Sequence, residues 1–376
     1  MKKLFYVGLA GLVLFEAANV YFIMPMPFSQ RMRSIDVAYF LFTSRWAFRC
    51  VFGLMAHVGA RQAFSAAGWR KAPAFVLAPI AAFLVYVLNF QMAADRMFLE
   101  PASVRMQTAD RNVVEPGRLV VGIEVGGDAR AYPNQFIGYH HQVRDSAGGK
   151  PVMVSYCTVC RTGRVFEPMV DGKLETFRLV GMDHFNAMFE DRTTRSWWRQ
   201  ATGEAITGPS KGKFLKELPS VQVSLGQWLA MHPKSLIMQP DSTMLRRYPT
   251  TYAYESGASK SSLTGTDTGS WNDKSWVVGV AVNGGAKAFD WNRLKKERVV
   301  NDVVGGKAVV VALASDGLSF YAYERPDAAT KFTIRGDSLL AKGKTFALGG
   351  KTLPAVSASQ EFWHSWRTFH PTTETY

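Results

Sequence analysis

Two cysteines separated by two residues form the most chemically capable pair in the chain. Cys157 and Cys160 lie in Ser155-Tyr-Cys-Thr-Val-Cys-Arg-Thr-Gly163, directly after a run typical of a β-strand. This spacing brings two sulfurs together in a short loop, and such pairs often have lowered thiol pKa values. Arg161 follows at once, where its charge would stabilise a thiolate. The pattern favours thiol–disulfide chemistry, with Cys157 attacking and Cys160 resolving.

Two other uses of the cysteine pair are open. In an oxidising compartment the pair could form an inert structural disulfide. The thiolates could instead bind a metal with the imidazoles of His140, His141 and His184, and soft sulfur ligands would favour copper. No CxxCH sequence is present, so covalent haem attachment has no support. The expected cofactor is therefore none or copper.

An internal repeat separates scaffold residues from reactive ones. Residues 121–132 match residues 278–289 at an offset of 157, and the match continues from 148–154 to 305–311. Later, Trp228 and Trp366 begin matching segments at an offset of 138. The alignment puts Ala314 and Gly317 opposite Cys157 and Cys160. Because the second copy lacks the cysteines, the architecture does not require them, and a site in the first copy is favoured.

The repeat predicts a mainly β outer domain (β-rich α+β) built from two duplicated units. Short β-branched runs end at Gly-Gly turns, and a short helix is expected around each of Trp228 and Trp366. We expect the first unit over residues 118–250 and a second, degenerate unit over 270–376. Residues 97–117 are interpreted as a linker.

The first unit is longer than the second by about 20 residues, between Phe166 and Leu218. This extra segment contains His184, which is a further candidate catalytic residue beside Cys157, Cys160 and Arg161. It also contains Trp197 and Trp198, which could form the wall of a pocket, although buried tryptophans more often belong to a core.

Residues 1–96 are predicted to be an α-helical membrane anchor. Three apolar stretches, Leu4 to Met24, Val37 to about Val58 and Ala74 to Ala93, each reach the length of about 20 residues that spans a bilayer. Three spans would place the basic flanks on the cytoplasmic side and the C-terminal domain outside. Two spans would leave that domain in the cytoplasm. Glu16 is expected to pair with Arg45 and Arg49, since intramembrane charges normally pair.

The charge distribution argues against a nucleic-acid partner. The net charge of +14 is divided about equally between residues 1–96 and the rest, without a block dense in Lys and Arg. We expect no nucleic-acid partner. The expected partners are the lipid bilayer and an unknown redox partner or a small-molecule or metal ligand.

Three separate motifs resemble a bacterial family, domain-of-unknown-function family 3179. They are residues 154–166, the segment 191–200 with Gly203 and Gly208, and the closing segment 362–371. The resemblance covers roughly residues 110–376 and excludes the anchor. The family includes selenoproteins, which implies that a chalcogen in the Cys157/Cys160 motif can be reactive; many relatives have a small residue in place of Arg161. The expectation is a thiol–disulfide redox protein of the bacterial inner membrane, with its soluble domain in the periplasm.

Overall fold

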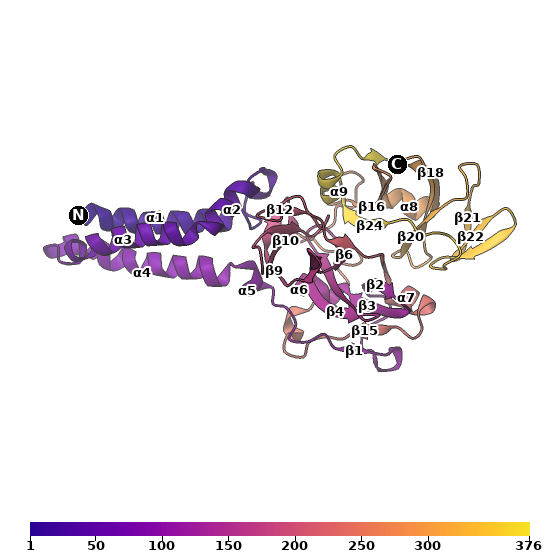
Figure 1. The fold of residues 1–376 in the computed structure, drawn as a ribbon, viewed down its shortest axis with the longest axis horizontal. Helices are drawn as coiled ribbons and strands as arrows, with labels where there is room; N and C mark the ends of the chain where they lie inside the picture. The colour runs from indigo at the N-terminus through magenta and orange to yellow at the C-terminus, as the bar shows by residue number, and fades with distance from the viewer. The chain divides into compact units, whose positions relative to one another are not determined.

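The computed structural model describes residues 1–376, which divide into two compact units. Unit 1 comprises Met1–Leu99, Phe177–Arg199 and Glu204–Lys213. Unit 2 comprises Glu100–Thr176, Gln200–Gly203 and Phe214–Tyr376. Each unit is described by itself, and Figure 1 labels the elements of both.

Unit 1 begins with three long helices that pack against one another (Figure 1). They are α1 (Lys2–Tyr21), α3 (Arg45–Phe64) and α4 (Ala72–Tyr86). By length and composition, two segments are apolar enough to cross a membrane, Lys2–Tyr21 and Gly68–Gln91. Shorter helical segments connect and follow them: η1 (Ser29–Arg31), α2 (Ile35–Thr43), η2 (Gly68–Lys71), η3 (Val87–Gln91) and α5 (Ala94–Met97).

The second expected span has different bounds in the structure. The apolar stretch from Val37 to Val58 is divided between α2 and α3 by a break at Ser44, and α3 continues to Phe64. Arg45, Arg49 and Arg61 all lie on α3, which makes it the least apolar of the three long helices. Hydropathy alone could not locate this break, because apolar residues stand on both sides of it.

A four-stranded sheet in unit 1 contains most of the segment between Phe166 and Leu218. Its order is β12-β11-β10-β9, with β9 (Phe177–Asp183), β10 (Asn186–Asp191), β11 (Trp197–Arg199) and β12 (Ala205–Thr207). The chain between α1 and α2 binds its edge, because Met182 N donates to Ile23 O over 2.7 Å. Gly181 permits this approach, since a Cβ there would lie 2.2 Å from the same oxygen.

The rings of Tyr39 and Phe42, from α2, meet Trp197 edge-on at 5.1 and 5.3 Å between centroids. Trp197 is completely buried, and Trp198 nearly so. Both tryptophans are therefore core residues, as buried tryptophans more often are, and they do not form the wall of a pocket.

Besides the two-stranded pair β7-β8, the first half of unit 2 has two larger sheets. One has the order β1-β15-β3-β2-β14 and the other β13-β6-β5-β4. A short helix follows β3 and another follows β14. The elements are β1 (Met106–Gln107), η4 (Ala109–Arg111), β2 (Leu119–Val125), β3 (Asp128–Pro133), α6 (Asn134–His140), β4 (Gln142–Ala147), β5 (Lys150–Cys157), β6 (Thr162–Glu167), β7 (Met169–Val170), β8 (Lys173–Leu174), β13 (Lys216–Glu217), β14 (Ser220–Ser224), α7 (Leu225–Met231), β15 (Leu236–Met238) and η5 (Leu245–Arg247).

The second half of unit 2 repeats this order of pairings. Its sheet β24-β16-β17-β25 has the same sequence of antiparallel and parallel neighbours as β14-β2-β3-β15, and β18-β19-β20 corresponds to β4-β5-β6. A third sheet, β21-β22-β23, is added. The elements are β16 (Trp276–Val282), β17 (Gly285–Asp290), α8 (Trp291–Glu297), β18 (Val299–Val304), β19 (Lys307–Leu313), β20 (Phe320–Glu324), β21 (Thr333–Arg335), β22 (Ser338–Ala341), β23 (Lys344–Ala347), β24 (Ala358–Phe362), α9 (Trp363–Phe369) and β25 (Glu374–Thr375).

A glycine and a tryptophan make the same close contact in each half. A Cβ on Gly122 of β2 would lie 2.4 Å from the Trp228 ring, and one on Gly279 of β16 would lie 2.1 Å from the Trp366 ring. Each indole also stacks on the histidine four residues later, at 4.1 and 3.9 Å between centroids. The glycines are needed because the rings of α7 and α9 lie directly on the strand backbone. The largest core cluster of unit 2 draws on both halves, from Val121 and Trp228 to Val310 and Tyr323.

Candidate functional site

The two cysteines lie at one end of the β5–β6 hairpin in unit 2. Cys157 is the last residue of β5 and pairs with Thr162, so that Cys160 lies in the turn between them. Arg161, the last turn residue, has the positive φ of 59° that usually favours glycine. Both cysteines are completely buried thiols, and their side chains are in hydrogen-bond contact with each other. The turn thus brings the two sulfurs together, as the spacing predicted.

Residues from the second half of unit 2 cover this turn. Phe362 N, at the end of β24, donates to Cys160 O over 2.9 Å. Ser365, in the first turn of α9, hydrogen-bonds the Cys160 thiol and donates to Glu361 Oε2 over 2.8 Å. His364 Nε2 lies 3.1 Å from Val159 O. The start of α9 therefore lies against the cysteine turn.

A buried lysine, Lys274, is the cation whose charge acts on the Cys160 thiol. Lys274 Nζ donates to Val159 O over 2.7 Å and to Leu263 O over 2.6 Å. Burial raises the pKa of Cys160 well above its usual value, and contact with Cys157 raises it further. The Ser365 hydrogen bond and the Lys274 charge act in the opposite direction without reversing the shift. In the closed structure Cys160 is thus a neutral thiol at neutral pH.

Arg161 has a different role from the one expected. Its buried guanidinium donates to Gln360 Oε1 over 2.9 Å and to the carbonyls of Tyr254 and Glu255 over 3.0 and 3.1 Å. It also lies 3.6 Å from the centroid of the Trp276 ring, a favourable cation–π distance. These contacts fasten the turn to the second half of the unit. The cation that acts on the Cys160 thiol is Lys274, not Arg161.

The three histidines of the expected metal site lie in separate surroundings. His140 Nε2 lies 2.7 Å from the Tyr248 hydroxyl, and burial lowers the pKa of His141 to about 4. His184 belongs to unit 1, in the β9–β10 turn, where Nδ1 lies 2.7 Å from Asp183 Oδ1. The structure contains no group of three or more His, Cys, Asp or Glu side chains that could hold a metal ion. The expected set of thiolates and imidazoles is not assembled.

Sequence reasoning missed the residues that cover the cysteines, namely Lys274, His364 and Ser365. The sequence predicts a helix around Trp366 and a family motif at residues 362–371, but it does not indicate that this segment covers the cysteines. Its contact with the turn joins residues about 200 positions apart, as in the bond from Phe362 N to Cys160 O. No local pattern reports such a contact.

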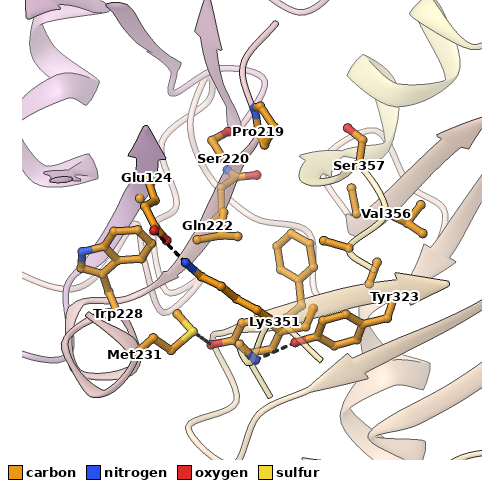
Figure 2. A pocket seen from close by; sticks show the side chains of 18 of the residues that line it. Glu124, Pro219, Ser220, Gln222, Trp228, Met231, Tyr323, Lys351, Val356 and Ser357 are labelled. Carbon is orange, nitrogen blue, oxygen red and sulfur yellow. Dashed lines mark hydrogen bonds and ion pairs between the residues drawn. The ribbon is translucent and has the colours of Figure 1, made fainter. Parts of the chain in front are cut away.

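A cleft of about 700 Å³ is a second candidate site in unit 2 (Figure 2). Strands β2 and β14 with helix α7 line one side, and β20 with residues 349–358 lines the other. Trp228, Met231 and Tyr323 contribute apolar surface. Lys351 crosses to Glu124 with an Nζ–Oε1 distance of 2.7 Å. An apolar cleft with few polar groups is the usual form of a binding site.

Comparison with known proteins gives a family and no individual relative. No curated protein and no solved structure matches the chain. The family model described as Protein of unknown function (DUF3179) matches residues 99–373. This range holds both sheet systems of unit 2, the inserted sheet and the cysteine turn. The chain therefore belongs to the DUF3179 family.

Proposed function

We propose that the chain is a membrane-anchored protein whose outer domain contains a thiol–disulfide redox couple, Cys157 and Cys160. One observation supports this most strongly: the two thiols are in contact with each other at a turn that also meets Ser365 and the charge of Lys274. A disulfide needs little more than the loss of two hydrogens from such a pair. In this proposal Cys157 is the attacking thiol, and Cys160, which burial holds in its neutral form, is the resolving one.

The proposed reaction exchanges electrons with the disulfide of a partner protein. The Cys157 thiolate attacks one partner sulfur, which forms a mixed disulfide and releases the first partner thiolate. Cys160 then loses its proton, and its thiolate attacks the Cys157 sulfur. The bond between Cys157 and the partner breaks, which releases the second partner thiolate and leaves a Cys157–Cys160 disulfide. Two electrons pass to the partner, whose two thiolates take up the two protons. The reverse sequence oxidises a partner dithiol.

Access to the buried thiols requires the cover to move. The start of α9 is held to the turn by the bond from Phe362 N to Cys160 O and by the contact of His364 with Val159 O. A buried pair of this kind exchanges slowly unless a partner or a local opening exposes it. We therefore propose a gated redox couple, which reacts only when the start of α9 moves away from the thiols.

The compartment belongs to the same proposal. We infer that α1, α3 and α4 cross the bacterial inner membrane and place unit 2 in the periplasm, where disulfides persist. Lys2 and Lys3 begin α1, while Arg61, Arg70 and Lys71 lie at the turn from α3 to α4, as expected for two cytoplasmic flanks. A C-terminal alkaline phosphatase fusion should be active. An inactive fusion would place the domain in the cytoplasm.

The two halves of unit 2 are proposed to be duplicated copies of one unit. The shared strand order and the two Gly–Trp contacts support a common origin. If so, the cysteines belong to the first copy alone, and the second copy shows how the same turn is built without them.

The redox proposal is tested by counting thiols in the full chain, purified in detergent with Cys50→Ser to remove the third cysteine. A maleimide label added after denaturation should find no thiol in the air-oxidised protein and two after mild native reduction with dithiothreitol. Failure to reduce without denaturation would return the pair to an inert disulfide. Tight binding of one Cu(I) per reduced pair, with no exchange toward a protein disulfide, would favour the copper-binding alternative.

A further inference from the structure

The outer edge of β14 borders the cleft, and its backbone direction can be derived. Leu225 N donates to Arg118 O over 2.8 Å, which is the end of the ladder between β14 and β2. Ser224 N, one residue earlier, turns the other way and donates to Ser319 Oγ over 2.9 Å. In an antiparallel ladder these directions alternate. Ser220 and Gln222 therefore direct their N–H and C=O groups away from β2, at positions that line the cleft.

The corresponding edge of the second half is already occupied. On β24, Phe362 N donates to Cys160 O, and Gln360 N donates to Gln222 Oε1 over 2.9 Å. On β14 the structure gives the outward backbone groups of Ser220 and Gln222 no such partner. A strand edge in this state is a template for another strand.

A side-chain amide of β14 also lines the cleft. Gln222 is only 7% exposed, and it lines the cleft. Its Oε1 accepts from Gln360 N, but its Nε2 has no hydrogen-bond partner in the structure. This amide N–H can donate to a carbonyl group of an occupant of the cleft. Figure 2 shows Gln222, Trp228, Met231 and Tyr323 around one space.

The charged side chains that line the cleft indicate which charge an occupant would carry. Glu124 and Glu217 are the carboxylates lining the cleft, and Arg164, the cation beside Glu217, is committed to Glu361 at 2.7 Å. Lys351, the cation on Glu124, is 77% exposed and thus held weakly. Burial lowers the pKa of His232, which keeps it neutral. A basic side chain can replace Lys351 on Glu124.

From these observations we propose that the cleft binds an extended peptide segment of a partner protein, which adds a strand to β14. Its backbone would pair with Ser220 and Gln222, one apolar side chain would lie over Trp228 and Met231, and a basic side chain would meet Glu124. Strand addition is a common mode of peptide recognition, in which backbone bonds give affinity and pockets give selectivity. This binding activity does not depend on the cysteine chemistry.

The test uses the full chain in detergent and fluorescent, end-blocked hexapeptides that alternate Val, Leu or Phe with Lys. Wild type should bind some of them at or below about 1 mM, and the matched peptides with Asp in place of Lys should not bind. Methylation of alternate backbone nitrogens should abolish binding in only one of the two alternating phases, as expected for a paired strand. Glu124→Gln should weaken binding about tenfold, which corresponds to one ion pair worth about 1.4 kcal/mol. Lys351→Ala should strengthen it.

Ser220→Pro is the sharpest variant, because it removes an outward N–H and leaves the β2 ladder intact. It should weaken binding at least tenfold without lowering the melting temperature. Lys344→Ala, in β23 and away from the cleft lining, is the control and should bind as wild type does. The proposal is overturned if none of these basic peptides binds, if methylation has the same effect in both phases, or if Glu124→Gln and Ser220→Pro both bind as wild type does.

Discussion

The turn at Cys157–Arg161 and the turn at Ala314–Leu318 stand at matched places in the two halves of unit 2. The first turn follows β5 and the second follows β19, and each meets the start of a helix from the other half. Phe362 N binds the first turn through Cys160 O, and Ser224 N binds the second through Ser319 Oγ. The two halves thus cover each other's turns in a reciprocal way.

The contents of the two turns differ completely. The second turn is closed by hydroxyl and carboxylate groups, with Ser224 Oγ and Ser319 Oγ both donating to Asp316 Oδ2, over 2.7 and 2.6 Å. The first contains two buried thiols and the buried charges of Arg161 and Lys274. The same architecture therefore closes with or without thiols. The comparison indicates that a turn of this shape does not need cysteines, because Ala314 and Gly317 occupy the matched positions in the second turn.

The largest effect is expected at Arg161, whose counterpart is Leu318. Arg161→Leu would leave Gln360 Oε1 and the carbonyls of Tyr254 and Glu255 without their buried donor, and should lower the free energy of unfolding by about 3–5 kcal/mol. Leu318→Ala, at the matched position, should cost about 1 kcal/mol or less. Thermal melting of the full chain in detergent measures both. Equal effects would mean that Arg161 does not fasten the first turn.

The stability of the folded chain should depend on pH through His364 on α9, the helix that covers the thiols, whereas α7 has no histidine at the matched position. The pKa of His364 is lowered to about 4, mainly by burial, and Gly226 holds the matched position on α7. Since the unfolded chain binds a proton near pH 6.5 and the folded one does not, stability is full above pH 6.5 and falls as pH drops toward 4. The loss is about 3 kcal/mol.

The His364→Gln variant measures how much of the stability lost at low pH is due to His364. Between pH 7 and pH 4.5 its melting temperature should fall less than that of wild type, with the residual slope due to other buried histidines such as His141. Parallel curves for the two proteins would show that His364 is already protonated in the folded state.

The Gly–Trp contacts should respond alike in both halves. Gly122→Ala and Gly279→Ala each place a methyl group against an indole ring and should each cost about 2–3 kcal/mol by overpacking. Gly226→Ala is the control, since the new Cβ would make an ordinary contact of 3.4 Å. If only one of the two alanine variants is destabilised, the halves are not equivalent in packing.

The smallest effect is expected from the cysteines themselves. Cys157→Ala with Cys160→Ala should cost no more than about 2 kcal/mol, because a disulfide across so short a loop restrains the unfolded chain little and the second turn closes without sulfur. Chemical denaturation of the oxidised wild type and the double variant gives the difference. A double variant that does not fold would make the pair part of the scaffold.

Much of the fold was predictable because it is local. The short helix expected around Trp228 is present over Leu225–Met231. The turns at Gly126–Gly127 and Asn283–Gly284 both have positive φ values. The predicted pairing of Glu16 with Arg49 is confirmed, at 2.6 Å, because opposite charges in apolar helices have few alternatives. Arg45 does not share that carboxylate; it donates to Phe42 O over 2.5 Å.

The rest depended on contacts that no local pattern encodes. The position of Cys157 and Cys160 at a turn followed from spacing, but Lys274 and His364 reach that turn from the second half of the unit. The sequence leaves Trp197 open between a core residue and a pocket wall, because its ring partners Tyr39 and Phe42 come from a helix far away in the chain. Both outcomes are set by long-range packing.

The central claim is that Cys157 and Cys160 form a gated redox couple, and its reduction potential tests this most directly. The full chain with Cys50→Ser should be equilibrated in glutathione buffers of stepped potential, trapped with acid and labelled on its thiols. The account predicts a reversible two-electron transition above about −300 mV, the level below which structural disulfides usually lie. Opening the cover with Phe362→Pro, which removes the N–H that binds Cys160, should speed equilibration. A transition well below that level, or none in the native protein, would contradict the claim.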